Sequence, residues 1–307
     1  MSWLYPFFKL KIHQEGYLNK PKHRIYYRAY GNPQGIPVLS FHGGPGGGSN
    51  EKYAKLFDFK KYYFIQFDQR GGCRSETKDF LYKNTTQNLI QDAHDILNLL
   101  KIKRKIIVHG VSWGSTLALV FAETYPKLVQ NIIVSAVFLA RPYDTDWVKK
   151  DSIRFYPDLW TTMQNQLPES KNIRQKYYKM LFSDNPEDNN KALSYLGSYE
   201  YMLGSLDPHF TKRTELNAQE LQETRIAFYY EKNNYFLEND QILKNADKIK
   251  DIPTLITHNR MDFCCPVQQA WDLHLKLPQS TLIIVPDYGH TSKRLTKETK
   301  YQIKNFI

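Results

Sequence analysis

The chain has 307 residues, 41% of them hydrophobic, which is enough for one large core with an inserted segment. Its net charge of +11 could suit a nucleic acid, but the basic residues are scattered, so we interpret the excess as a solvated surface. The three cysteines, Cys73 and the adjacent Cys264 and Cys265, neither form the framework of a secreted domain nor have metal-ligand spacing, which indicates a reducing cytoplasm.

Strand and helix patterns alternate along the first half of the chain. The first ten residues contain Pro6 and no preceding cationic segment, so they predict neither a signal peptide nor a membrane span. Strands are expected over 25–29, 37–41, 63–67, 106–109 and 132–135, and helices over 86–100 and 112–125. Such alternation is typical of an α/β protein whose mostly parallel sheet has helices on both faces.

The second half of the chain begins with a different pattern. From residue 138 to about residue 230 the strand signal disappears, and the sequence is aromatic, charged and helical in character. Strands are expected again over 253–257 and 281–285, with a helix near 267–277 and an amphipathic helix from about Thr296. The sequence therefore predicts one α/β domain, residues 1–137 and 231–307, into which residues 138–230 are inserted as a helical lid.

Residues 110–114 form a G-x-S-x-G pattern between an expected strand and an expected helix, as in a nucleophile elbow. The two glycines are expected because the backbone of the nucleophile is strained and packs closely against its neighbours. This turn presents Ser112 at a helix N-terminus, where the amide of Trp113 can face an oxyanion. The pentapeptide also occurs by chance, but the flanking strand and helix favour catalysis.

A nucleophilic serine needs a base, a residue that orients the base, and a second oxyanion donor. Asp262 follows the expected strand 253–257, and His290 follows the expected strand 281–285. The order Ser, Asp, His is that of an α/β-hydrolase, although each residue could instead be an ordinary polar loop residue. Asp287 is a rival for the orienting role, but it is close in sequence to His290.

The second oxyanion donor is expected in the glycine-rich loop 42–48, which follows the expected strand 37–41, with Gly44 as the candidate. Such a loop could also bind phosphate, but neither a G-K-S/T continuation nor G-x-G-x-x-G spacing is present. We expect His42 and His109 to help shape the site.

Taken together, these motifs closely resemble those of the prolyl aminopeptidase (proline iminopeptidase) family of α/β-hydrolases, from about Gly16 onward. The segments that carry the resemblance are 26–27, 31–33, 42–48, 67–71, 84–86, 110–119, Asp262, 265–266, 270–274 and 289–290. The resemblance implies removal of an N-terminal proline from peptides by Ser112, Asp262 and His290, without a metal or cofactor. The implied partner is a small peptide with a free N-terminus, and neither a nucleic acid nor a membrane.

The resemblance also implies that carboxylates in the lid bind the substrate amine and that aromatic residues surround the proline ring. Glu200 matches one of these carboxylates, and a buried ammonium group requires such a countercharge. Glu231 is a second candidate for this charge. The aromatic candidates are Phe138, Tyr199 and Tyr195.

Several positions depart from the family pattern, and three of them bear on the preference for proline. Ser135 stands where the family has arginine, Lys149 replaces part of an aromatic pair, and Ala227 replaces a second glutamate. These departures concern substrate binding rather than the catalytic residues. The sequence therefore supports the catalytic chemistry better than it supports the preference for proline.

The sequence predicts a cytoplasmic serine exopeptidase that releases an N-terminal residue, preferably proline, from short peptides. One alternative is a related esterase or amidase whose lid no longer recognises an amine, which a Glu200 side chain pointing away from the serine would favour. Another is a catalytically silent binding protein on this fold. The sequence indicates no oligomeric state.

Overall fold

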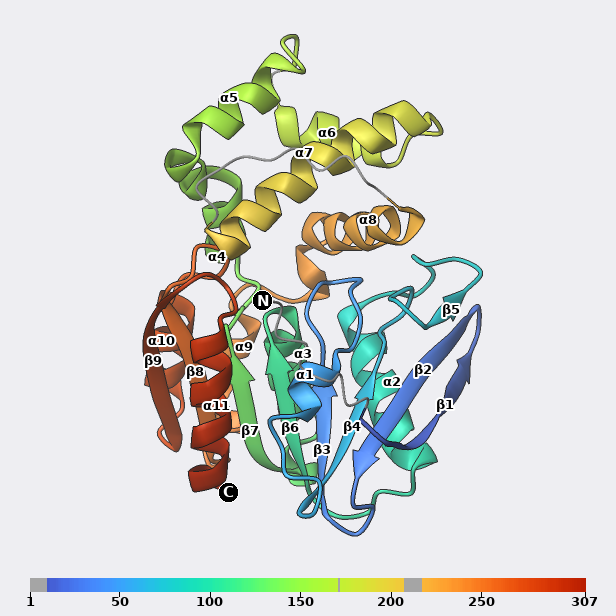
Figure 1. The fold of residues 1–307 in the computed structure, drawn as a ribbon, viewed down its shortest axis with the longest axis vertical. Coiled ribbons are helices and arrows are strands. Elements are labelled where there is room, and N and C mark those ends of the chain that lie inside the picture. Colours follow the sequence, from blue (N-terminus) through green and yellow to red (C-terminus); the bar gives the residue numbers. More distant parts are fainter. Residues whose placement is uncertain (1–9, 171, 207–216) are drawn as a thin grey trace, which may run out of the picture.

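The computed structural model describes residues 10–170, 172–206 and 217–307, which form a nine-stranded sheet with helices on both faces (Figure 1). The strands are β1 (Ile12–Lys20), β2 (His23–Gly31), β3 (Ile36–Phe41), β4 (Tyr62–Phe67), β5 (Glu76–Thr77), β6 (Ile106–Val111), β7 (Val129–Ser135), β8 (Thr254–Met261) and β9 (Ser280–Tyr288). The α-helices are α1 (Glu51–Ala54), α2 (Thr86–Leu99), α3 (Trp113–Thr124), α4 (Pro142–Asp146), α5 (Pro157–Asn165), α6 (Ile173–Leu181), α7 (Pro186–Ser205), α8 (Ala218–Lys232), α9 (Gln241–Lys244), α10 (Gln268–Lys276) and α11 (Lys293–Phe306).

The sheet has the strand order β1-β2-β4-β3-β6-β7-β8-β9, with β5 paired to β2. All pairs from β4 to β9 along this order are parallel, whereas β1, β2 and β5 add antiparallel pairs at one edge. The predicted α/β class and mostly parallel sheet are therefore confirmed. Because the parallel strands end at the same edge, the loops that follow them meet there, as at ligand sites of other α/β sheets.

Alternate residues of the central strands face two separate apolar clusters. Leu39 and Phe41 of β3 pack in the cluster that includes residues of α2, α3 and α10. Val38 packs in the other cluster, with residues of α11 and the segment around α1. Both faces of these strands are buried, which explains why their sequences are continuous apolar runs rather than alternating ones.

The structure differs from the sequence prediction mainly at element ends and at one edge. β1 was not predicted because it is a polar edge strand whose side chains are exposed or half-buried. β8 continues to Met261, so Asp262 follows the strand directly. The last helix begins at Lys293 rather than near Thr296, because the Ser292 side chain caps it by accepting a hydrogen bond from the Leu295 amide at 3.0 Å.

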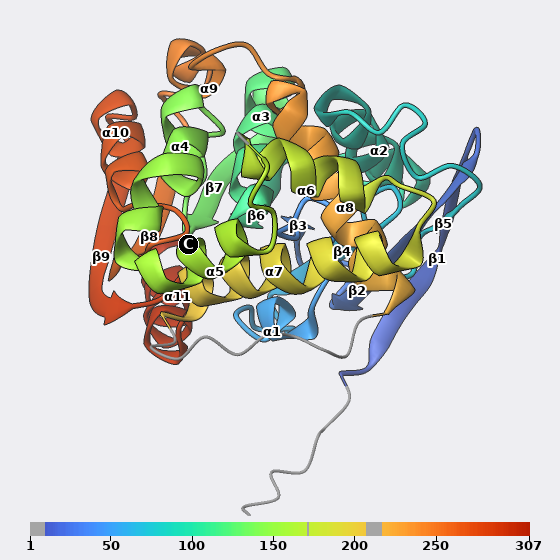
Figure 2. The same cartoon turned by 90° about the horizontal axis from the view of Figure 1, so that it is seen from above.

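Helices α4 to α8 follow β7 and precede β8, and we call them the helical layer. They lie together above one end of the sheet and cover it when seen from above (Figures 1 and 2). The layer has its own apolar cluster, which includes Leu159, Tyr177, Leu193 and Phe228. This supports our proposal that residues 138–230 form a lid inserted into the α/β domain. None of the described helices is long and apolar enough to cross a membrane.

Candidate active site

Ser112 occupies the sharp turn between β6 and α3, with φ 59° and ψ −130°. A non-glycine residue with positive φ costs of the order of 1–3 kcal/mol, so the surroundings must hold it in place. The Ser112 amide donates a hydrogen bond to the Ser135 carbonyl at 3.1 Å. The Ser112 carbonyl accepts one from the Ser115 hydroxyl at 2.6 Å. The strand, the turn and the helix thus fix the backbone of the candidate nucleophile.

The two glycines of the elbow allow a close approach between backbone segments. A Cβ atom at Gly110 would lie 2.0 Å from the Gly114 carbonyl oxygen. A Cβ atom at Gly114 would lie 2.2 Å from the Phe41 carbonyl oxygen. No side chain fits at these separations, so β3, β6 and α3 can meet at Ser112 only if both positions are glycine.

His290 and Asp262 form a hydrogen-bonded pair on the loops after β9 and β8. His290 Nδ1 lies 2.8 Å from Asp262 Oδ2, and Asp262 is buried. Asp262 Oδ1 accepts hydrogen bonds from the amides of Cys264 and Cys265, at 2.9 and 2.8 Å. Asp262, and not its rival Asp287, is therefore the carboxylate that contacts this imidazole.

The buried pair shifts the proton affinities of both side chains. Burial alone would raise the pKa of Asp262, but the charge of His290 and hydrogen bonds with His258 and His290 hold it well below its ordinary value. Burial alone would lower the pKa of His290, but the negative charge of Asp262 outweighs this and raises it. The carboxylate thus stays ionised, and it makes the imidazole a stronger base.

A catalytic serine and its base usually share a hydrogen bond, but Ser112 and His290 form none in this structure. His290 Nε2 is buried and has no hydrogen-bond partner among the described residues. Catalytic hydrogen bonds are often long in substrate-free sites and shorten when substrate binds. The fold therefore assembles the imidazole and carboxylate but leaves the contact with the serine open.

Gln69 ties the glycine-rich loop to the start of α3. Its amide nitrogen Nε2 donates to the His42 carbonyl at 2.9 Å, and its Oε1 accepts from Trp113 Nε1 at 2.9 Å. His42 Nε2 in turn accepts from the Gln69 amide at 2.9 Å, so His42 shapes this region as expected. His109 instead lies buried within the sheet, hydrogen-bonded to Ser40 at 2.9 Å.

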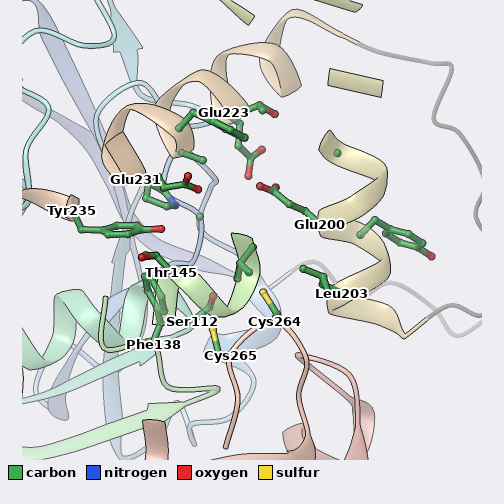
Figure 3. A pocket seen from close by; sticks show the side chains of 18 of the residues that line it. Ser112, Phe138, Thr145, Glu200, Leu203, Glu223, Glu231, Tyr235, Cys264 and Cys265 are labelled. Atoms are coloured by element: carbon green, nitrogen blue, oxygen red, sulfur yellow. The ribbon is translucent and has the colours of Figure 1, made fainter. Parts of the chain in front are cut away.

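Ser112 and Gly44 line a cavity of about 380 Å³ beneath the helical layer (Figure 3). Five carboxylates also line this cavity: Asp144 on α4, Glu200 on α7, and Glu220, Glu223 and Glu231 on α8. Figure 3 shows Glu200 extending from α7 toward α8, where Glu223 and Glu231 lie. The candidate nucleophile thus shares a cavity with a group of acids, as the position of Glu200 in the sequence led us to expect.

Glu231 is neutralised by two cations of the helical layer. Its carboxylate lies 2.9 Å from Arg174 and 3.2 Å from Lys149. Lys149, a departure from the family pattern, therefore serves as an ion-pair partner. Another departure, Ser135, hydrogen-bonds to Thr257 at 2.6 Å. Because its charge is balanced, Glu231 is a weaker candidate for binding a substrate amine than the sequence indicated.

The Glu200 side chain lines the cavity and is exposed to the water inside it. Protein surrounds this cavity and separates it from much of the bulk water. This partial removal from bulk water raises the pKa of Glu200 to about 7. The positive charge of Arg174 opposes the shift, and the negative charges of Glu231 and Glu223 add to it. Glu200 therefore changes its ionisation near neutral pH.

Of the predicted aromatic residues, Phe138 lines the cavity and the other two do not. Tyr195 and Tyr199 are buried in the apolar cluster of the helical layer. The Tyr199 hydroxyl also donates to the Val148 carbonyl at 2.8 Å. Successive residues of a helix point about 100° apart, so Tyr199 faces the layer's core while the adjacent Glu200 faces the cavity.

Sequence reasoning missed Glu223, Phe228 and Tyr235, which all line the cavity. Glu223 lies one helical turn before Ala227, so both face the cavity from the same side of α8. That spacing was a usable signal for Glu223. Tyr235 follows α8 in a short turn, with its ring centroid 5.0 Å from that of Phe138. No sequence pattern predicts that a turn residue such as Tyr235 lines the cavity.

Comparisons with known proteins agree with this geometry. Residues 36–293 match the family described as alpha/beta hydrolase fold. A proline iminopeptidase of Xylella fastidiosa is 34% identical over 279 residues, which cover 88% of this chain and 88% of the relative. A proline iminopeptidase of Arabidopsis thaliana is 36% identical over 277 residues, covering 88% of this chain and 73% of the relative.

Solved structures support the same fold. An alpha/beta hydrolase from a deep-sea metagenome library has a TM-score of 0.61 at 18% identity and covers 95% of this chain and 96% of its own. A proline iminopeptidase-related protein of Thermus thermophilus has a TM-score of 0.58 at 16% identity, covering 97% of this chain and 99% of its own. With the elbow, the acid-lined cavity and the sequence relatives together, this chain belongs to the proline iminopeptidase family of α/β-hydrolases and is a serine hydrolase of that type.

Proposed function

We propose that this enzyme is a serine exopeptidase that releases an N-terminal residue, preferably proline, from short peptides. The observation that carries the proposal is that Ser112 and Glu200 line the same cavity. Glu200 extends into this cavity rather than away from the serine (Figure 3). A carboxylate in this position can hold the ammonium group of a substrate whose first peptide bond lies at Ser112. An esterase or amidase without amine recognition has no need of it.

In the proposed reaction, Ser112 Oγ attacks the carbonyl carbon of the N-terminal residue while His290 Nε2 accepts the hydroxyl proton. Asp262 holds the imidazole through Nδ1, where the distance is 2.8 Å. The amides of Trp113 and Gly44 stabilise the oxyanion. His290 then protonates the departing peptide amine, and water hydrolyses the acyl-enzyme by the same steps in reverse order.

The amine would be held by Glu200 together with Glu223. Both carboxylates line the cavity, and they come from α7 and α8 respectively. Arg174 and Lys149 already balance Glu231, so Glu200, which lines the same cavity, provides the negative charge that favours an ammonium group. Glu223 thus compensates, from one turn earlier on α8, for the glutamate that Ala227 replaces.

The preference for proline rests on the aromatic wall of the cavity. The rings of Phe138 and Tyr235 meet edge to face, with centroids 5.0 Å apart and planes at 74°. Tyr235 also packs against Trp113 at 5.5 Å, which fixes the wall next to the candidate nucleophile. A compact, apolar pyrrolidine ring suits such a rigid wall. We also propose that the enzyme works in the cytoplasm, because all three cysteines are free thiols.

Changing Glu200→Gln should lower kcat/KM for a prolyl arylamide about tenfold to a hundredfold. The change removes a charge-assisted contact worth roughly 1.5–3 kcal/mol while keeping the size of the side chain. Glu223→Gln should produce a smaller, severalfold loss. An acetyl ester carries no ammonium group, so its hydrolysis should be nearly unchanged in both variants. Steady-state kinetics with the two substrates measures these effects.

The matched control is Glu187→Gln, which alters an exposed glutamate at the far end of the same helix α7. Its kcat/KM should equal that of the wild type for both substrates. If the wild type hydrolyses an N-acetylated prolyl arylamide as well as the free form, the esterase or amidase alternative is correct. If a fluorophosphonate probe fails to label Ser112, the protein is instead a silent binding protein.

The kcat/KM ratio of prolyl arylamide to acetyl ester should rise severalfold between about pH 6 and about pH 8. Only ionised Glu200 binds the ammonium group, and its pKa is raised to about 7, so binding improves as Glu200 loses its proton. Taking the ratio cancels the titration of His290, which both substrates share. The rise should disappear in Glu200→Gln. A ratio independent of pH in the wild type would mean that Glu200 does not contact the amine.

A further inference from the structure

Two thiols and an imidazole converge beside Ser112. Cys264 Sγ, Cys265 Sγ and a ring nitrogen of His290 all lie within 4.8 Å of one another, a grouping found among the described residues. Both cysteines are free, and both line the cavity with Ser112 (Figure 3). The spacing of the cysteines alone indicated no metal site. Folding supplies the missing ligand from a loop that is 25 residues away in the sequence.

The imidazole is already oriented as a metal-binding histidine is. His290 Nδ1 is engaged by Asp262 at 2.8 Å, which leaves Nε2 as the nitrogen that can bind a metal. Nε2 is buried and has no hydrogen-bond partner among the described residues. In zinc proteins the ligating histidine usually gives its other ring N–H to a carboxylate, which fixes the ring and strengthens the ligand. Asp262 provides this support here.

The same carboxylate also fixes the segment that carries the thiols. Asp262 Oδ1 accepts hydrogen bonds from the amides of Cys264 and Cys265, at 2.9 and 2.8 Å. One buried side chain therefore holds both the imidazole and the backbone of the two cysteines. Two thiolates and one imidazole form a donor set that suits Zn²⁺ and Cd²⁺, for which water can supply a fourth ligand.

We propose that Cys264, Cys265 and His290 form an inhibitory site for a thiophilic divalent cation such as Zn²⁺. Binding displaces the two thiol protons to solvent and forms two metal–sulfur bonds and one metal–nitrogen bond, with no change of oxidation state. The metal occupies the lone pair of Nε2, so His290 can no longer accept the proton of Ser112. The binding itself is independent of the proposed function, whereas the inhibition rests on the role of His290 in it.

The proposed metal site of this chain depends on Cys264. Cys265 is part of the Cys-Pro pair that carries the family resemblance, whereas Cys264 lies outside those motifs. Without Cys264, one thiol and one imidazole would remain, which is a much weaker donor set. Cys73 offers a matched control because it is an exposed cysteine outside the cluster.

Cd²⁺ titration of the full chain under a phosphine reductant tests the binding, with cadmium–thiolate absorption in the ultraviolet as the readout. The wild type and Cys73→Ser should bind one strong equivalent with this absorption. Cys264→Ser should bind Cd²⁺ at least about tenfold more weakly. Equal absorption and affinity in Cys264→Ser and the wild type would overturn the proposal, as would loss of the site in Cys73→Ser.

The second arm measures inhibition without relying on a peptide substrate. Zn²⁺ should slow fluorophosphonate labelling of Ser112 in the wild type and in Cys73→Ser, and EDTA should restore the rate. Each variant is compared with its own metal-free rate, and Cys264→Ser should be slowed much less. Labelling that responds to Zn²⁺ equally in all three proteins would refute the inhibitory site. Because both readouts ignore peptide specificity, their failure is distinguishable from failure of the aminopeptidase proposal.

Discussion

Replacing Ser112 by alanine is expected to lower kcat for a prolyl arylamide by about 10⁴-fold or more. No neighbouring hydroxyl can take its place. The Ser115 hydroxyl donates to the Ser112 carbonyl at 2.6 Å and accepts from the Phe138 amide at 3.0 Å. The Thr116 hydroxyl donates to the Phe138 carbonyl at 2.6 Å. Both side chains therefore hold the elbow in place and are not available as nucleophiles. Steady-state kinetics of the variant measures the loss of kcat.

The fold should survive this substitution, because the Ser112 side chain makes no capping hydrogen bond to α3. The unfolding temperature of Ser112→Ala should match that of the wild type. A fluorophosphonate probe should label the wild type and leave the variant unlabelled. Substantial turnover by a folded Ser112→Ala variant would refute the proposed nucleophile.

Changing Asp262→Asn should lower kcat by about 10³- to 10⁴-fold for both the prolyl arylamide and the acetyl ester. An asparagine can keep the bonds to the amides of Cys264 and Cys265 through its oxygen. Its NH₂ group would then face His290 Nδ1, which cannot remain the protonated nitrogen. The imidazole would carry its proton on Nε2, where it cannot act as a base toward Ser112.

Asp287→Asn is the matched control for Asp262→Asn, since it alters the other aspartate near His290 in the sequence. We expect it to keep the wild-type kcat for both substrates. A large loss in Asp287→Asn, together with a small loss in Asp262→Asn, would reverse the assignment of the orienting carboxylate.

The sequence predicted the features that depend on local spacing. The elbow was recognisable because Gly110 and Gly114 must lie two residues from Ser112 for three backbone segments to meet. The ends of β8 and β9 carry Asp262 and His290, and parallel strands bring such ends to one edge. The parallel sheet and the pairing of these two residues therefore followed from short-range patterns and general rules of topology.

The substrate side of the cavity was harder to predict, because it depends on how helices rotate and pack. Tyr195 and Tyr199 are close in sequence to residues that line the cavity, yet they face the core of the helical layer. Glu231 looked available, but Arg174 from α6 balances its charge across a separation of 57 residues. Such contacts between distant segments have no signature in a single sequence.

The backbone amide of His290 donates a hydrogen bond to the carbonyl of Gly204, at 2.7 Å. Gly204 lies on α7, about one turn after Glu200. One helix thus connects Glu200, which we propose binds the substrate amine, to the loop that holds the imidazole. This fixed separation would determine where the peptide is cut, because it would match the length of one residue and not of two. The selection of a single terminal residue would then depend on the rise of one turn of α7.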